Sequence, residues 1–127
     1  MNKPLLMIVD DDFNLAKLLQ DLANDVGFNA QTYQHHKEFK TSYLASTPVA
    51  IFMDIVMPDV DGNELIEWLV KQGSETPLVI MSGYNGQYLD ISKTLADGRG
   101  AVVVATLVKP FSLDEIEKLL TEIMELA

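Results

Sequence analysis

The residues of this chain best suited to chemistry are carboxylates that directly follow runs of apolar residues. Asp10 and Asp11 follow the run at 5–9, and Asp54 follows the run at 49–53. A continuous apolar run of this length is typical of a strand that is buried on both faces. If the three carboxylates meet at one edge of a sheet they repel one another, and a hard divalent cation bound through oxygen is the usual counter-charge.

A hydroxyl and an ammonium group complete the set. Ser82 ends the apolar run at 77–81, and Lys109 ends the run at 101–108. Magnesium combines one or two carboxylates with a phosphate oxygen, while a serine hydroxyl and a lysine ammonium can bind two further phosphoryl oxygens. None of these residues is suited to act as an independent general base. The set predicts in-line attack of a carboxylate on phosphorus, with Asp54 as the nucleophile.

Each feature has a simpler explanation when it is taken alone. A run of acids after a strand is more often a turn or a helix cap than a metal site, and Lys-Pro before a helix is a common solvated connection. Asp12, Asp59 and Asp61 fit helix ends and loops better than ligand positions. What predicts a site is that all these features coincide with the ends of four apolar strands.

Strands and helices alternate five times along the chain. Helical spacing of apolar residues follows the first run as far as Gly27, and further helices are predicted over 35–45, from Gly62 to Gly73, between 84 and 100, and from Ser112 onward. The segment 28–33 alternates apolar and polar residues, as an edge strand does. We predict one domain over residues 1–127, an α/β doubly wound (βα)5 sandwich of the flavodoxin-like type. Its parallel five-stranded sheet has the order 2-1-3-4-5.

Composition narrows the possible environments and partners. The 19 acidic and 9 basic residues give a formal charge of −10 without a basic stripe, which argues against direct binding of nucleic acid by this chain. The chain has no cysteine, so disulfides and thiolate metal sites are excluded, and we expect a cytoplasmic protein. The first apolar run is too short for a signal peptide or a membrane span.

The same residues resemble the response-regulator receiver domains of two-component signalling over the full length of the chain. The matching motifs are Val9-Asp10-Asp11-Asp12, Asp54-x-x-Met57-Pro58-x-x-Asp61-Gly62, Ser82-Gly83 and Lys109-Pro110-Phe111. By this resemblance Asp54 accepts a phosphoryl group from a histidine kinase or phosphotransfer protein. Asp11, Asp54 and the main-chain carbonyl of Val56 would bind Mg²⁺ directly, and Asp10 would act through a water.

The resemblance also implies roles for the remaining residues. Ser82 and Lys109 would contact the phosphoryl oxygens, and the Lys109-Pro110 bond would be cis. Phosphorylation would switch the face formed by the fourth helix, the fifth strand and the fifth helix. The partner there would be an effector, a missing C-terminal output domain or a second copy of the chain. Such a domain promotes only its own phosphorylation and dephosphorylation, without a membrane partner.

Some positions depart from the usual receiver pattern. Thr106 stands where receivers commonly carry a Tyr or Phe that acts as a rotameric switch, and Ser82 replaces the commoner threonine. The segment between Ser82 and Lys109 is longer than usual. Val56 and Tyr84 flank the path of a water that would attack the phosphoryl group. Because Val56 offers that water no polar guidance, we expect slow self-dephosphorylation.

Two other functions remain as alternatives. The chain could be a pseudo-receiver that is never phosphorylated and acts only as an interaction module. The second alternative is a phosphatase of the haloacid-dehalogenase type, because Asp10-x-Asp12, a later Ser and a later Lys mimic its motifs. That enzyme would use Asp10 as its nucleophile, leave Asp54 without a task and need a further acidic motif beyond Lys109. The chain has no P-loop or Gly-x-Gly-x-x-Gly turn after the first strand, which disfavours nucleotide binding.

Overall fold

Five strands alternate with five helices. The computed structural model describes residues 3–57, 61–83 and 86–127, and Pro58, Asp59 and Tyr84 lie outside this part. In chain order the elements are β1 (Leu5–Val9), α1 (Phe13–Val26), β2 (Asn29–Tyr33), α2 (His36–Ala45), β3 (Ala50–Asp54), α3 (Gly62–Lys71), β4 (Leu78–Ser82), α4 (Gly86–Gly98), β5 (Val103–Val108) and α5 (Leu113–Leu126). Within the described residues, none of the helices has the length and apolar character needed to cross a membrane.

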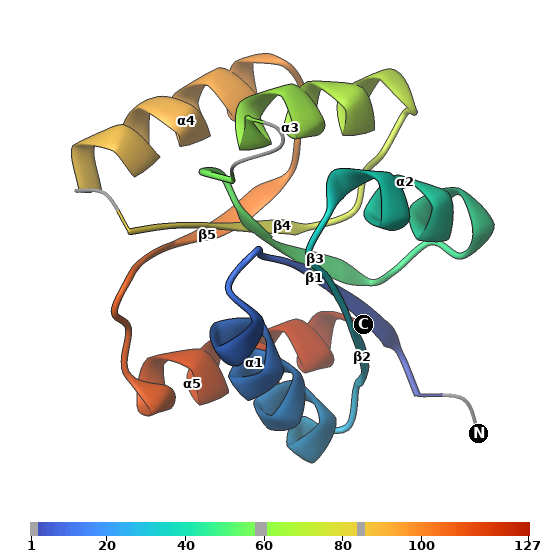
Figure 1. Cartoon of the computed structure of the whole chain (residues 1–127), viewed down its shortest axis with the longest axis vertical. Coiled ribbons are helices and arrows are strands. Elements are labelled where there is room, and N and C mark those ends of the chain that lie inside the picture. The colour runs from blue at the N-terminus through green and yellow to red at the C-terminus, as the bar shows by residue number, and fades with distance from the viewer. Residues whose placement is uncertain (1–2, 58–60, 84–85) are drawn as a thin grey trace.

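All five strands pair in parallel, in the order β2-β1-β3-β4-β5. This confirms the predicted flavodoxin-like α/β sandwich. α1 and α5 cover one face of the sheet, and α2, α3 and α4 cover the other (Figure 1). Val9 pairs with Met53, and Asp54 pairs with Met81, so the carboxyl ends of the three central strands are level. Polar residues that follow these strands are therefore brought to one edge of the sheet.

The central strands are buried because helices cover both faces. Every residue of β3 and of β4 is buried, as their unbroken apolar runs predict. Successive side chains point to opposite faces, so Phe52 packs with α1 and α5 while Met53 packs with the three helices on the other side. Burial of a side chain such as Phe52 stabilises the fold by roughly 1.5–3 kcal/mol. The strand that carries Asp54 is thus held rigidly on both sides.

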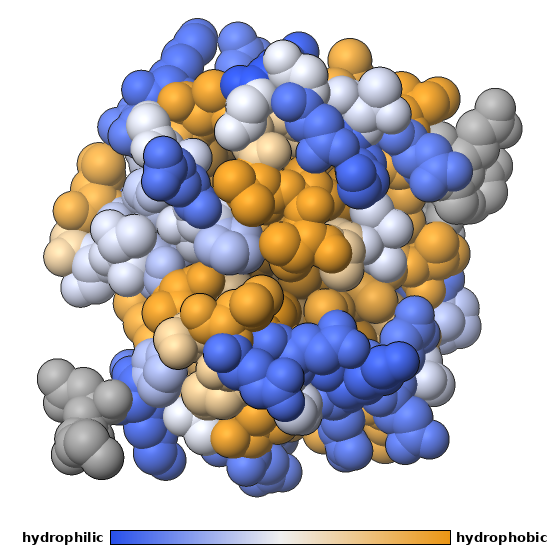
Figure 2. Space-filling view, turned by 180° about the vertical axis from the view of Figure 1, so that it is seen from behind, coloured by the Kyte–Doolittle hydropathy of each residue, from blue (hydrophilic) through white to orange (hydrophobic). Residues whose placement is uncertain are grey.

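β5 forms the edge of the sheet opposite β2. The apolar run at 101–108 predicts a strand over its whole length, but the strand begins at Val103, and its register with β4 is irregular between Leu78 and Val79. Val104 and Val108 are 41% and 42% exposed because they lie at this outer edge. Figure 2 views the molecule from behind and shows apolar side chains gathered across the middle of the face, with hydrophilic residues above and below.

Acidic side chains in the turns after β1 and β3 cap the next helices. Asp12 accepts a hydrogen bond from the Leu15 amide at 3.2 Å at the start of α1, and Asp61 accepts one from the Asn63 amide at 2.9 Å at the start of α3. Such a cap stabilises a helix by about 1 kcal/mol. The structure confirms these two acids as helix-end residues, and the caps fix the starts of the helices that follow the site.

Candidate functional site

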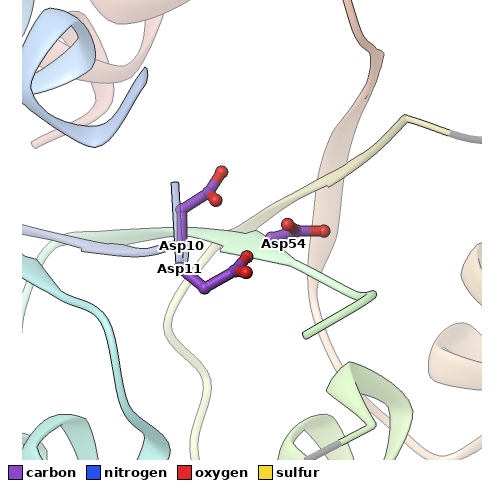
Figure 3. Close-up of side chains that lie close together, drawn as sticks. All are labelled: Asp10, Asp11 and Asp54. Carbon is purple, nitrogen blue, oxygen red and sulfur yellow. The ribbon is translucent and has the colours of Figure 1, made fainter. Parts of the chain in front are cut away.

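Three carboxylates meet at the edge where the strands end. Asp10 and Asp11 lie in the turn between β1 and α1, and Asp54 is the last residue of β3 (Figure 3). One oxygen atom from each lies within 4.8 Å of the other two. Asp10 and Asp54 are 0% and 4% exposed, whereas Asp11 is exposed to solvent. The expected cluster forms, and one of its carboxylates is open to an incoming ion.

Lys109 reaches two of these carboxylates from the end of β5. Its Nζ donates to Asp10 Oδ2 at 2.9 Å and to Asp54 Oδ2 at 3.1 Å. Its backbone amide donates to the Ser82 carbonyl at 2.8 Å, which fixes the lysine beside the end of β4. Sequence reasoning placed Lys109 near a phosphoryl group but missed both ion pairs. No local pattern signals them, because the partners are 99 and 55 residues away along the chain.

Backbone amides hold the other oxygen of each buried carboxylate. The Asp12 amide donates to Asp10 Oδ1 at 2.9 Å, and the Val56 amide donates to Asp54 Oδ1 at 2.9 Å. Each carboxylate therefore has one oxygen on the backbone and one on Lys109, which fixes its orientation. A carboxylate oxygen can accept more than one partner, so these bonds leave capacity for a metal ion or for attack on phosphorus.

Burial and charge shift the titration of two groups in the site. Burial raises the pKa of Asp10 above its ordinary 3.8, although the hydrogen bonds from Lys109 and from the Asp12 amide oppose the shift. Burial alone would lower the pKa of Lys109, but its hydrogen bonds and attraction to Asp10 and Asp54 outweigh burial and raise that pKa. Lys109 is therefore charged at neutral pH, while ionised Asp10 is destabilised. A further cation beside Asp10 would relieve that destabilisation.

The other predicted site residues lie around this cluster. Ser82 is completely buried at the end of β4, the strand beside β3. Val56 is half-buried and pairs with Asp61 in an isolated antiparallel bridge. Thr106 is a half-buried residue of β5. The Lys109-Pro110 peptide bond is cis, as the resemblance implied. The structure thus brings the three carboxylates and Lys109 into one cluster, with Ser82 and Val56 on the segments that frame it.

Comparison with known sequences identifies the family. The sequence model described as the response regulator receiver domain matches residues 6–121. The chain belongs to this family. The probable transcriptional regulator ycf27 of Cyanophora paradoxa is 27% identical to this receiver domain over 117 residues, which are 92% of the chain and 46% of the relative. The DNA-binding transcriptional regulator NtrC of Salmonella typhimurium is 27% identical over 115 residues, 91% of the chain and 24% of the relative. The receiver domain spans less than half the length of these relatives.

Solved structures show the same relationship. A response regulator from Colwellia psychrerythraea is similar with a TM-score of 0.85 and 29% identity, over 99% of this chain and 100% of that one. The receiver domain of Francisella response regulator 1452 has a TM-score of 0.80 and 25% identity, over 96% and 97% of the two chains. This protein is a response-regulator receiver domain of two-component signalling.

Proposed function

We propose that this receiver domain takes a phosphoryl group onto Asp54 from the phosphohistidine of a kinase or phosphotransfer protein. The observation that carries the proposal is the meeting of Asp10, Asp11 and Asp54 beside Lys109. β3 is the middle strand of the sheet, so Asp54 lies at the centre of the edge where the charged groups gather. Asp10 is completely buried and bridged to the lysine, which favours a supporting role for it.

The donor set fits Mg²⁺. Three carboxylates and one ammonium group carry a formal charge of −2, which one divalent cation neutralises. The side-chain ligand atoms of the cluster are carboxylate oxygens, which this hard cation prefers. Asp11, Asp54 and the main-chain carbonyl of Val56 would hold the ion directly, and Asp10 would hold it through water. When bound, the ion neutralises charge on the transferring phosphoryl group.

Transfer needs a positioned nucleophile and donors for the phosphoryl oxygens. An oxygen of the Asp54 carboxylate attacks phosphorus in line, and an O–P bond forms as the bond from phosphorus to the donor imidazole nitrogen breaks, its electron pair leaving with that nitrogen. Lys109, already 3.1 Å from Asp54, moves its ammonium group to a phosphoryl oxygen, and the Ser82 hydroxyl donates to another. Attack of water on phosphorus later breaks the bond between phosphorus and the Asp54 oxygen, which restores the carboxylate and releases inorganic phosphate. Val56 offers that water no polar group, so we propose that the restoration is slow.

The proposed output surface is the α4-β5-α5 face (Figure 2). It exposes large apolar side chains on α4, before β5 and on β5, each between 41% and 54% exposed: Ile91, Leu95, Val102, Val104 and Val108. Thr106 has no ring to swing, so the signal would pass from the phosphoryl group through Ser82 and its loop to α4. An output domain, a separate effector or a second copy of the chain would bind there.

We further propose that residues 1–127 form one domain that works in the cytoplasm without direct nucleic-acid or membrane contact.

The test is phosphorylation by acetyl phosphate with Mg²⁺, followed by intact mass spectrometry. Wild type is expected to gain one phosphoryl group, and Asp54→Asn none. Asp12→Asn is the matched control, because it makes the same chemical change at a helix cap beside the cluster and should leave phosphorylation intact. Beryllofluoride with Mg²⁺ should change the oligomeric state or the α4-β5-α5 face of wild type alone. Phosphorylation that survives in Asp54→Asn would contradict the proposal.

The alternatives predict different results. A pseudo-receiver would remain folded but take up neither phosphoryl group nor beryllofluoride. A phosphatase would turn over a generic phosphate ester, and this activity would be lost in Asp10→Asn but kept in Asp54→Asn. The two variants therefore separate the three functions in one set of assays.

A further inference from the structure

Gly62 occupies a position where no side chain fits. This buried residue begins α3, and a Cβ atom built on it would lie 2.2 Å from the Ile55 Cα and 2.9 Å from the Ile55 carbonyl carbon and Cβ. Backbone atoms cannot rotate out of the way. Gly98 differs, because a Cβ there would meet nothing within 4 Å in the described structure. Neither glycine has a positive φ, so Gly62 is required for space rather than for backbone conformation.

The close approach clamps the two ends of the β3–α3 connection together. The Gly62 amide donates to the Ile55 carbonyl at 3.0 Å, and the neighbouring residues Val56 and Asp61 pair in the antiparallel bridge. Val56 in turn donates its amide to Asp54 Oδ1 at 2.9 Å. A continuous chain of backbone contacts thus runs from Gly62 to the carboxylate of Asp54 and to the peptide unit that carries the Val56 carbonyl.

We propose that Gly62 is a positioning residue for the metal and phosphoryl site: its lack of a side chain lets α3 seat on Ile55 and thereby sets the Val56 carbonyl and the Asp54 carboxylate. The inference rests on the proposed function, because those two groups matter only if they bind Mg²⁺. To reach an ordinary contact distance of 3.4 Å, an alanine Cβ would have to push the two backbones apart by about 1 Å. Metal–ligand distances tolerate only about 0.2 Å, so a displacement of this size exceeds what the site can absorb.

Helix stability alone predicts the opposite effect of the substitution. Alanine is a better helix former than glycine, so Gly62→Ala considered within α3 alone would favour the helix. The steric argument instead predicts that the site loses its geometry. Mg²⁺ affinity therefore distinguishes a positioning role from a general contribution to folding.

The experiment measures Mg²⁺ affinity by isothermal titration calorimetry. Gly62→Ala is expected to bind Mg²⁺ about 10- to 100-fold more weakly than wild type, the range found when groups that orient metal ligands are changed. Gly98→Ala, the same substitution in open space, should bind within about twofold of wild type. Leu69→Ala removes a buried side chain from the same helix, so it should unfold more easily and yet keep its Mg²⁺ affinity. Wild-type affinity in folded Gly62→Ala would overturn the inference.

If Gly62→Ala does not fold, a second pair of variants tests whether the start of α3 positions the Mg²⁺ site. Asp61→Ala and Asp61→Asn remove the same charge next to Gly62, but only asparagine can still accept the Asn63 amide and hold the turn. We expect Mg²⁺ binding several-fold weaker in Asp61→Ala than in Asp61→Asn, and equal affinities would overturn the inference. Failure of wild type itself to bind Mg²⁺ and to be phosphorylated would instead overturn the proposed function, and the inference with it.

Discussion

The two ends of the same parallel strands bury different groups. β4 begins with Leu78, which is 2% exposed and apolar, and ends with Ser82, which is completely buried and polar. β3 begins with Ala50 and ends with the buried carboxylate of Asp54. The carboxyl ends therefore hold groups that are costly to desolvate, while the amino ends hold groups that stabilise the fold by being buried.

The amino ends are built for stability. Pro4, Pro48 and Pro77 stand one or two residues before β1, β3 and β4, where the missing proline amide leaves no donor unpaired in the sheet. A groove of about 620 Å³ crosses this end, lined by the loops before β3 and β4, by Val104 and by the end of α5. The difference between the two ends teaches that the chemical groups gather at one edge of the sheet, while β3 and β4 begin at the opposite edge with buried apolar residues. It can be tested by substitution at each edge.

The largest effect, on stability and phosphorylation together, is expected from Lys109→Met at the carboxyl edge. This variant leaves two buried carboxylates without their cation, so the free energy of unfolding should fall by about 3 kcal/mol. We expect the lower part of the usual range because 20% of the lysine side chain is exposed. Phosphorylation should also be lost. Urea unfolding without divalent ions measures the stability, and Mg²⁺ should restore part of it by binding the folded state. Lys109→Arg keeps the charge and should lose less stability than Lys109→Met. If Lys109→Met is as stable as wild type, the buried charges at the carboxyl ends do not need the lysine, and the proposed difference between the two ends is wrong.

At the amino edge, Leu78→Ala should weaken folding without touching the chemistry. Truncation of a fully buried leucine costs about 2–5 kcal/mol through lost burial and the cavity that remains. The rate of phosphorylation per folded molecule should stay that of wild type when it is measured well below the unfolding temperature. Ser82→Ala, on the same strand, is the matched variant and should slow phosphorylation while changing stability much less. If Leu78→Ala also slows the chemistry, the two ends are not independent.

Asp10→Asn should stabilise the protein in a manner that depends on pH. The pKa of Asp10 is raised in the folded state, so the folded protein is destabilised at every pH above that raised pKa, where the side chain is ionised. As the pH falls through the raised pKa towards 3.8, the penalty is removed. Without divalent ions, Asp10→Asn should therefore unfold at a higher temperature than wild type at pH 7, and the advantage should vanish below pH 3.8. If Asp10→Asn and wild type have the same melting temperature at pH 7 as well as below pH 3.8, the burial of ionised Asp10 does not destabilise the fold.

The smallest effect is expected from Val56→Asn. Its amide side chain can orient the water that attacks the phosphoryl group, and one hydrogen bond of about 1 kcal/mol corresponds to roughly fivefold faster hydrolysis. Loss of phosphate from the labelled protein after removal of the donor measures the rate. Val56→Leu is the control, because it keeps an apolar side chain and should leave the lifetime long. A slower asparagine variant would count against the proposed slow hydrolysis.

The order of the elements and the edge that carries the site could be predicted because every candidate residue follows an apolar strand. In a sheet of parallel strands joined by helices, the carboxyl ends must share one edge. Asp10, Asp54, Ser82 and Lys109 therefore had to gather there once the strands were recognised. The extent of β5 was less predictable, because its apolar run continues before Val103 while pairing with β4 begins only at that residue and becomes regular from Ala105.

The environment of each charged group could not be predicted. Asp10 and Asp11 are neighbours of identical chemistry, yet Asp10 is completely buried and bridged to Lys109 while Asp11 is exposed. Gly62 likewise stands in a sequence motif that gives no sign of its contact with Ile55. Such contacts depend on how close distant segments approach, which no periodicity encodes.

The sequence by itself determined the five strands, the helices between them and the kinds of side chain at the strand ends, because these depend on residue type and local spacing. Only the tertiary structure decided which carboxylate is desolvated, that one lysine bridges two of them, and that α3 must begin with a residue lacking a side chain. The physical reason is that burial and distance are set by packing between segments as far apart as Asp10 and Lys109, 99 residues along the chain.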